Sequence, residues 1–172
     1  GGGGAREMMK DGLFDKFPME AIFGAHNWPG MKMGQFALKS GPVFASSNEF
    51  KITIRGKGAH AAMPHNGIDP VPVACQMVQA FQTIVTRNRK PIDPGVLSVT
   101  MIHAGEATNV VPDFAELRGT VRTFSIETLD LIEQRMKQVA ENLCAAFGAT
   151  RPDLFGREIP ILGVAGDQQA AT

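Results

Sequence analysis

The fold is decided by residues 115–147, AELRGTVRTFSIETLDLIEQRMKQVAENLCAAF, in which the hydrophobic period changes from two residues to about 3.6. Up to Val121, small or apolar residues alternate with polar ones, which predicts a half-buried strand. Ser125 is a favoured helix N-cap, and after it the apolar residues recur at helical spacing. They predict one long helix whose buried stripe consists of Leu129, Ile132, Met136, Val139, Leu143 and Phe147.

The same alternation of apolar and polar residues occurs twice upstream. Residues 49–55 and 97–101 predict two further strands. Between them, Asp69 and Pro70 predict a helix start, because aspartate caps helices well and proline lacks the N–H that would be unsatisfied in the first turn. Residues 48–148 therefore read as strand, helix, strand, strand, helix.

One more strand would complete a split β-α-β unit. The predicted fold class is α+β, a ferredoxin-like β-α-β-β-α-β sandwich with an antiparallel sheet and two helices on one face. The apolar residues 159–164 can supply the last strand, although Pro160 restricts it to a sheet edge or a strand start. The apolar residues 21–23 predict a separate short strand that ends just before His26.

Charge and cysteine content limit the partners and the compartment. The 172 residues include 17 Lys and Arg and 17 Asp and Glu, and this balance argues against nucleic acid, whose binding relies on excess positive charge. No apolar run approaches the roughly 20 residues of a membrane-spanning helix, so we expect no membrane partner. Cys75 and Cys144 match no zinc spacing, and buried thiols in a reducing cytoplasm explain them better than a disulfide does.

Polar residues in loops rich in glycine and proline are the candidates for chemistry. His26 at the end of a strand is well placed to ligate a metal, but for a lone histidine a loop imidazole bonded to nearby backbone is the commoner explanation. His60 has small neighbours that leave its ring open to a ligand, whereas the competing interpretation is a surface loop with incidental histidines. Asn109 lies between two strands, where turn formation is the commoner role.

The remaining polar residues carry a weaker signal. Arg118 and Arg122 share the polar face of their predicted strand, which is most simply a solvated face. His103 continues the alternation of Leu97 and Val99, so a partly buried ring is expected. The sequence contains no nucleophile elbow, phosphate-binding loop or dinucleotide fingerprint. The residues alone thus predict an α+β domain whose polar loop residues have no assigned purpose.

Several stretches, in this order, resemble the M20 family of metal-dependent peptidases and amidohydrolases, in particular its hippurate hydrolase and N-acyl-amino-acid amidohydrolase branch. They are GGGGAR (1–6), DGLF (11–14), GAHNWPG (24–30), GKGAHAAMPH (56–65), NVVP (109–112) and LRGTVRTF (117–124). The resemblance implies a catalytic domain with two zinc or manganese ions and an inserted lid that also forms a homodimer. It makes residues 1–42 a remnant of the catalytic domain and residues 43–150 the lid and dimerisation domain.

The resemblance also implies roles for single residues. His26 corresponds to a metal ligand, and His60 corresponds to a lid histidine that reaches the partner subunit's site and stabilises a tetrahedral oxyanion. Asn109 and Arg122 correspond to lid residues that bind the carboxylate or backbone of a small N-acyl amino acid or peptide. Arg122 suits this role because a planar guanidinium can hold a carboxylate through two hydrogen bonds.

The family's paired glutamates, one of them the general base, would stand immediately before Gly1. Other metal ligands of the family are also missing from this sequence, and His26 alone cannot make a two-metal site. We therefore expect no stoichiometric metal and no amide hydrolysis by this polypeptide alone, which would act mainly in folding and self-association. The alternative is a hydrolase that another chain completes, with a metal at His26.

Residues 151–172 resemble a different family, glycerol kinase. The segment GDQQA (166–170) implies a catalytic aspartate at Asp167 and a glycerol-contacting glutamine at Gln168. The nucleotide-binding parts of a kinase are absent from the sequence, so kinase activity is not expected, although a glycerol-binding remnant is a third hypothesis. The resemblance indicates a chimera of two unrelated fragments, in which the kinase-like tail supplies the last strand.

Overall fold

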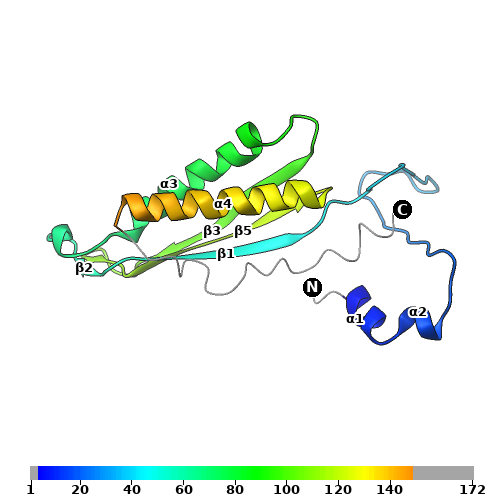
Figure 1. Ribbon diagram of the computed structural model, residues 1–172, viewed down its shortest axis with the longest axis horizontal. Coiled ribbons are helices and arrows are strands. Elements are labelled where there is room, and N and C mark those ends of the chain that lie inside the picture. The colour runs from blue at the N-terminus through cyan, green and yellow to red at the C-terminus, as the bar shows by residue number, and fades with distance from the viewer. Residues whose placement is uncertain (1–3, 149–172) are drawn as a thin grey trace.

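The computed structural model describes residues 4–148, and its core is an antiparallel sheet of three strands in the order β1-β5-β3. Two helices cover the same face of this sheet (Figure 1). The elements of this core are β1 (Asn48–Arg55), α3 (Pro70–Thr83), β3 (Gly95–Ala104), β5 (Phe114–Thr123) and α4 (Ile126–Ala146). This arrangement confirms the predicted ferredoxin-like α+β fold. The last strand, predicted at residues 159–164, lies outside the described residues.

Shorter elements surround the core. They are α1 (Gly4–Lys10), α2 (Leu13–Lys16), the two-residue strands β2 (Ala59–His60) and β4 (Val110–Val111), a 3-10 turn at Pro64–Asn66 and a π-helical turn at Ile84–Asn88 that continues α3. β2 and β4 pair with each other beyond the end of the main sheet. They carry two of the candidate residues, described below.

The core lies between the sheet and the two helices, as the alternation predicts. Every second residue of β1 and of β5 is buried, and α3 and α4 each contribute one apolar stripe. In α4 the stripe continues through Ala140 and Cys144, and not through Phe147. The prediction for Phe147 is wrong because the helix ends at Ala146, so its side chain no longer follows the helical period.

Both predicted helix starts are confirmed by their capping hydrogen bonds. The Asp69 carboxylate accepts the Val71 N–H at 2.9 Å, and the Ser125 hydroxyl accepts the Thr128 N–H at 3.2 Å. These bonds satisfy backbone donors that have no partner inside the helix. In the part of the chain that the structure describes, neither α3 nor α4 nor any other helix has the length and apolarity needed to cross a membrane.

A β-bulge in β3 changes the face on which its side chains lie. The pairing of β3 with β5 shifts between Val99 and Met101, which places His103 opposite Glu116 on the open face of the sheet. A bulge inserts one extra residue, so every later side chain changes sides. His103 is exposed, as are its neighbours at this end of β3, and the expectation of a partly buried ring is wrong.

Two other local expectations are also wrong. Residues 21–23 form no strand, because no other described segment pairs with them and an extended backbone needs such a partner for its N–H and C=O groups. Cys75 is exposed, since it lies on the face of α3 that points away from the sheet. Cys144 is buried as predicted.

Glu116 forms two ion pairs on the face of the sheet that no described helix covers. The Glu116 carboxylate contacts Lys51 Nζ at 2.5 Å and Arg118 Nε at 2.6 Å. The hydrogen bonds from Lys51 and then from Arg118 lower the pKa of Glu116 below its ordinary value of 4.5. Because the folded pKa is the lower one, the ionised carboxylate stabilises the fold above the ordinary value, and this stabilisation is lost as the pH falls through the folded pKa.

A Glu116→Gln variant should therefore lose stability in a pH-dependent way. We expect its free energy of unfolding to fall by about 0.5–1 kcal/mol near neutral pH, the size typical of exposed ion pairs. The difference from the wild type should shrink as the pH is lowered from about 7 to about 3. Glu49→Gln on the same face is the control, because Glu49 makes no ion pair with any described residue. A loss of unfolding free energy that is the same at every pH would contradict the assignment of the lowered Glu116 pKa to these ion pairs.

Candidate functional site

His60 and Asn109 lie side by side at one end of the sheet. His60 in β2 is opposite Val110 in β4, and the Ala61 N–H donates to the Asn109 carbonyl at 2.9 Å. The structure thus brings together two candidate residues that lie far apart in the sequence. Nothing in the local sequence around either residue indicates this pairing, because strands of two residues are too short to show a recognisable alternation.

Two glycines let the loop that carries His60 close on itself. Lys57 and Ile68 exchange backbone hydrogen bonds of 2.8 and 2.9 Å at the base of this loop. A Cβ atom on Gly56 would lie 2.2 Å from the Ile68 carbonyl oxygen, and one on Gly67 would lie 2.6 Å from the Lys57 carbonyl oxygen. Only glycine fits this close approach.

The hydrogen bonding of His60 defines the proton position on its ring. The Ala62 backbone N–H donates to His60 Nδ1 at 3.1 Å. Because Nδ1 accepts this bond, the ring proton is on Nε2, on the opposite side of the imidazole. The side chain is exposed, so the Nε2–H is available as a hydrogen-bond donor. A neutral imidazole in this tautomer can donate to an oxyanion.

Arg122 lies at the other end of the sheet. It is opposite Val96 near the end of β5, and its neighbour Thr123 accepts the Ser46 N–H at 2.7 Å. Arg122 is eight positions after Phe114, the first residue of β5, which corresponds to about 26 Å of strand. The structure therefore does not bring Arg122 next to His60 and Asn109 within one chain.

His26 is at the same end as Arg122. Its ring centroid is 5.0 Å from that of Phe44, and Phe44 leads directly into the Ser46 contact with β5. His26 Nδ1 lies 2.6 Å from the carbonyl oxygen of the next residue, Asn27, to which it donates. The side chain is exposed, and it lies in a segment without regular structure, not at the end of a strand as predicted.

The described residues do not fit a metal centre on their own. Among residues 4–148 there is no group of three or more His, Cys, Asp and Glu side chains that could hold an ion. His26 uses Nδ1 for the bond to Asn27 and offers one nitrogen, Nε2, whereas a zinc site has about four ligands. Asp167 and Gln168, the candidates from the kinase resemblance, lie outside the described residues.

A family model described as a peptidase dimerisation domain matches residues 46–147. The chain belongs to the M20 peptidase family. N-acetyl-L-cysteine deacetylase from Bacillus subtilis is 44% identical to this M20 chain over 146 residues, which cover 85% of the chain and 35% of the relative. N-acetyldiaminopimelate deacetylase from Listeria innocua is 42% identical over 141 residues, which cover 82% of the chain and 38% of the relative.

A solved structure is similar to this chain in fold as well as in sequence. The dinuclear metal-binding M20 peptidase from Bacillus subtilis superposes with a TM-score of 0.65 at 36% identity, covering 85% of this chain and 35% of that one. The M20 chain thus spans little more than a third of the curated relatives it matches. The matched family range runs from just before β1 to the end of α4, which is the sheet with both of its helices.

Proposed function

We propose that this chain is the lid and dimerisation part of a cytoplasmic amidohydrolase that removes the acyl group from an N-acyl amino acid or peptide. Family membership and the two deacetylases among its relatives support this proposal. In it, residues 1–42 belong to a metal-binding catalytic domain, and residues 43–150 form the lid. His60, Asn109 and Arg122 contact the substrate, and His26 is a metal ligand.

The observation that carries the proposal is the separation of the candidate residues. His60 and Asn109 lie at one end of β5, and Arg122 and His26 lie at the other, about 26 Å along the strand. Catalytic groups act within hydrogen-bond distance of the reacting atoms, so one chain cannot bring both ends to one small substrate. Two copies related by a twofold axis can, if the lid histidine of one copy completes the site of the other.

The strand β3 supports the second copy as the partner. It is an edge strand among the described residues, it has no Lys, Arg, Asp or Glu in Gly95–Ala104, and it exposes Val96, Met101 and Ile102. Long uncharged edges tend to pair with another chain. β1, at the other edge, carries Glu49, Lys51 and Arg55 instead. Pairing of β3 with β3 of a second copy would cover the apolar edge symmetrically.

An Ile102→Lys variant tests this dimer. We expect the wild-type chain to sediment as a concentration-dependent dimer, and the variant to bind its copy at least about tenfold more weakly, because the lysine would place a charge on the paired edge. Sedimentation equilibrium over a concentration series measures this change. Ile126→Lys is the matched control, since Ile126 at the start of α4 is 60% exposed and Ile102 is 53% exposed.

Two results would contradict the proposal. A wild-type chain that remains a monomer at high concentration would contradict the dimer. Amide hydrolysis supplies the second test, with N-acetylcysteine as substrate and zinc or manganese added. The chain alone should show no turnover above that of a His26→Ala variant. Turnover above this control would favour the alternative, in which a metal at His26 supports activity.

A further inference from the structure

A hollow of about 370 Å³ lies between the start of α3 and the loop that connects β3 to β4. It is open to solvent, and we call it the Glu106 hollow. Its apolar wall includes Val71, Val110 and Pro112, and the polar side chains that line it are those of Glu106 and Thr108. Sites for small molecules have volumes of about 300–1,000 Å³, so the Glu106 hollow is large enough for a small ligand.

The pairing of β2 with β4 places His60 beside the Glu106 hollow. His60 is directly opposite Val110, and the adjacent hydrogen bond from the Ala61 N–H to the Asn109 carbonyl makes them a non-hydrogen-bonded pair. The Cα atoms of such a pair are about 4.5 Å apart, and both side chains project from the same face of the ladder. Because Val110 lines the hollow, the exposed His60 ring lies next to it.

The loop between β3 and β4 carries Glu106 and Thr108 together with the candidate residue Asn109. Gly105 begins this loop with a φ of 67°, in the left-handed region that favours glycine. The Val110 N–H then donates to the Ala107 carbonyl at 3.4 Å, which closes a turn with Thr108 and Asn109 at its centre. A ligand that contacts Asn109 or His60 is therefore close to the Glu106 hollow.

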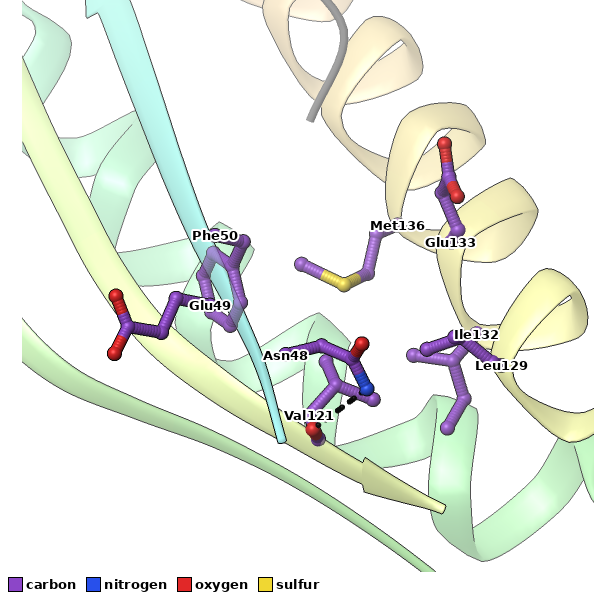
Figure 2. Close-up of a pocket in the computed structure, with 8 residues that line it drawn as sticks. All are labelled: Asn48, Glu49, Phe50, Val121, Leu129, Ile132, Glu133 and Met136. Carbon is purple, nitrogen blue, oxygen red and sulfur yellow. Dashed lines mark hydrogen bonds between the residues drawn. The ribbon is translucent and has the colours of Figure 1, made fainter. Parts of the chain in front are cut away.

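Glu106 gives the hollow a negative charge. It is the only charged residue among the described ones that line the hollow, and it makes no ion pair with any described residue. The apolar groove between β1 and α4, drawn in Figure 2, is different, because the Glu133 carboxylate that lines it contacts Lys137 Nζ at 2.5 Å. A carboxylate without a cation of its own is suited to bind the cationic group of a ligand.

We propose that the Glu106 hollow binds the amino-acid side chain of the substrate, and that Glu106 selects N-acyl amino acids whose side chain ends in an ammonium group. This inference rests on the proposed function, in which His60 donates to the substrate amide. When the acyl group is uncharged, the α-nitrogen is a neutral amide and the α-carboxylate is negative, so the side chain carries any positive charge. Val71 and Val110 would contact its methylene groups, and the Thr108 hydroxyl can accept a hydrogen bond from the ammonium group.

A titration of the isotope-labelled chain followed by nuclear magnetic resonance tests this selection. The ligands are Nα-acetyl-L-lysine, N-acetyl-L-norleucine, which has the same four side-chain carbons without the amine, and N-acetyl-L-glutamate. We expect acetyl-lysine to shift the amide signals of residues 106–110 with a Kd in the millimolar range. This Kd should be about two- to fivefold lower than that of acetyl-norleucine, the gain typical of an exposed ion pair. Acetyl-glutamate should bind most weakly, because its side chain is repelled by Glu106.

Two variants separate the role of Glu106 from a general effect of charge. Glu106→Gln should raise the Kd of acetyl-lysine to that of acetyl-norleucine and leave the Kd of acetyl-norleucine unchanged. Glu133→Gln is the matched control, since it removes a charge from the groove between β1 and α4 and should change none of the three Kd values. High salt should reduce the preference of the wild type for acetyl-lysine, because it screens exposed charges.

Three outcomes would overturn the proposal. The first is a wild-type chain in which no ligand shifts the signals of residues 106–110. The second is equal Kd values for acetyl-lysine and acetyl-norleucine. The third is a preference for acetyl-lysine that survives Glu106→Gln or is lost in Glu133→Gln, which would place the ligand elsewhere. The titration needs neither metal nor turnover nor a dimer, so its failure is distinct from a failure of the sedimentation and hydrolysis tests of the proposed function.

Discussion

A Gly119→Ala variant is expected to lose about 3 kcal/mol or more of its free energy of unfolding, at the upper end of overpacking substitutions. Gly119 is buried in the middle of β5, opposite Phe50 in β1 and Val99 in β3. A Cβ atom there would lie 2.0 Å from the Ser98 carbonyl oxygen and 2.5 Å from the Phe50 ring. The backbone of β3 would have to move, because a carbonyl in a sheet cannot rotate away as a flexible side chain can.

Urea unfolding measures this loss, and Gly24→Ala is the matched control. A Cβ atom on Gly24 would meet nothing within 4 Å, so its free energy of unfolding should stay within about 0.5 kcal/mol of the wild type. A loss below about 1 kcal/mol for Gly119→Ala would show that β3 can shift at little cost. Such a result would also weaken the proposed dimer, which needs β3 to hold a fixed edge.

The spacing of apolar residues along the sequence was sufficient to predict the helices and strands of the core. Alternation in residues 115–121 and the stripe that begins at Leu129 depend on local geometry, since a strand repeats every two residues and a helix about every 3.6. The caps Asp69 and Ser125 were predictable for the same reason, because each bonds to a backbone N–H within the next three residues.

Features that depend on pairing between distant segments were not predictable. The bulge after Val99 is a property of the register between β3 and β5, and it places His103 opposite Glu116. The pairing of His60 with Val110 likewise joins two short segments that show no pattern of their own. Gly56 and Gly67 are a sequence signal for the closed loop that carries His60, since a close backbone approach requires glycine, but they do not indicate its pairing with β4.

Whether an individual side chain is buried or exposed also could not be derived from the sequence alone. Cys75 lies in a helix whether its side chain is buried or exposed. Only the packing of α3 on the sheet determines that this side chain points away from the sheet. Residues 21–23 have the composition of a strand, but a strand exists only where a neighbour pairs with it.

A Phe81→Ala variant is expected to lose about 3–5 kcal/mol of its free energy of unfolding, as buried aromatic truncations do. Phe81 in α3 has no exposed surface, and its ring meets that of Phe50 edge-to-face at 6.5 Å. Its removal leaves a cavity between α3 and the sheet, which urea unfolding can measure. Phe36→Ala is the control, because Phe36 is 92% exposed and should change the stability by no more than about 0.5 kcal/mol.

Phe50 links the two large effects, and this allows a sharper test of the packing. Alanine at position 119 pushes against the Phe50 ring, whereas alanine at position 81 opens space beside that ring. In the Gly119→Ala/Phe81→Ala double variant, Phe50 can move into the space, so the total loss should be smaller than the sum of the single losses by about 0.5–2 kcal/mol. The relief is partial because the Ser98 carbonyl still blocks the new Cβ atom. Strict additivity would show that the backbone contact with β3, and not the Phe50 ring, sets the cost at Gly119.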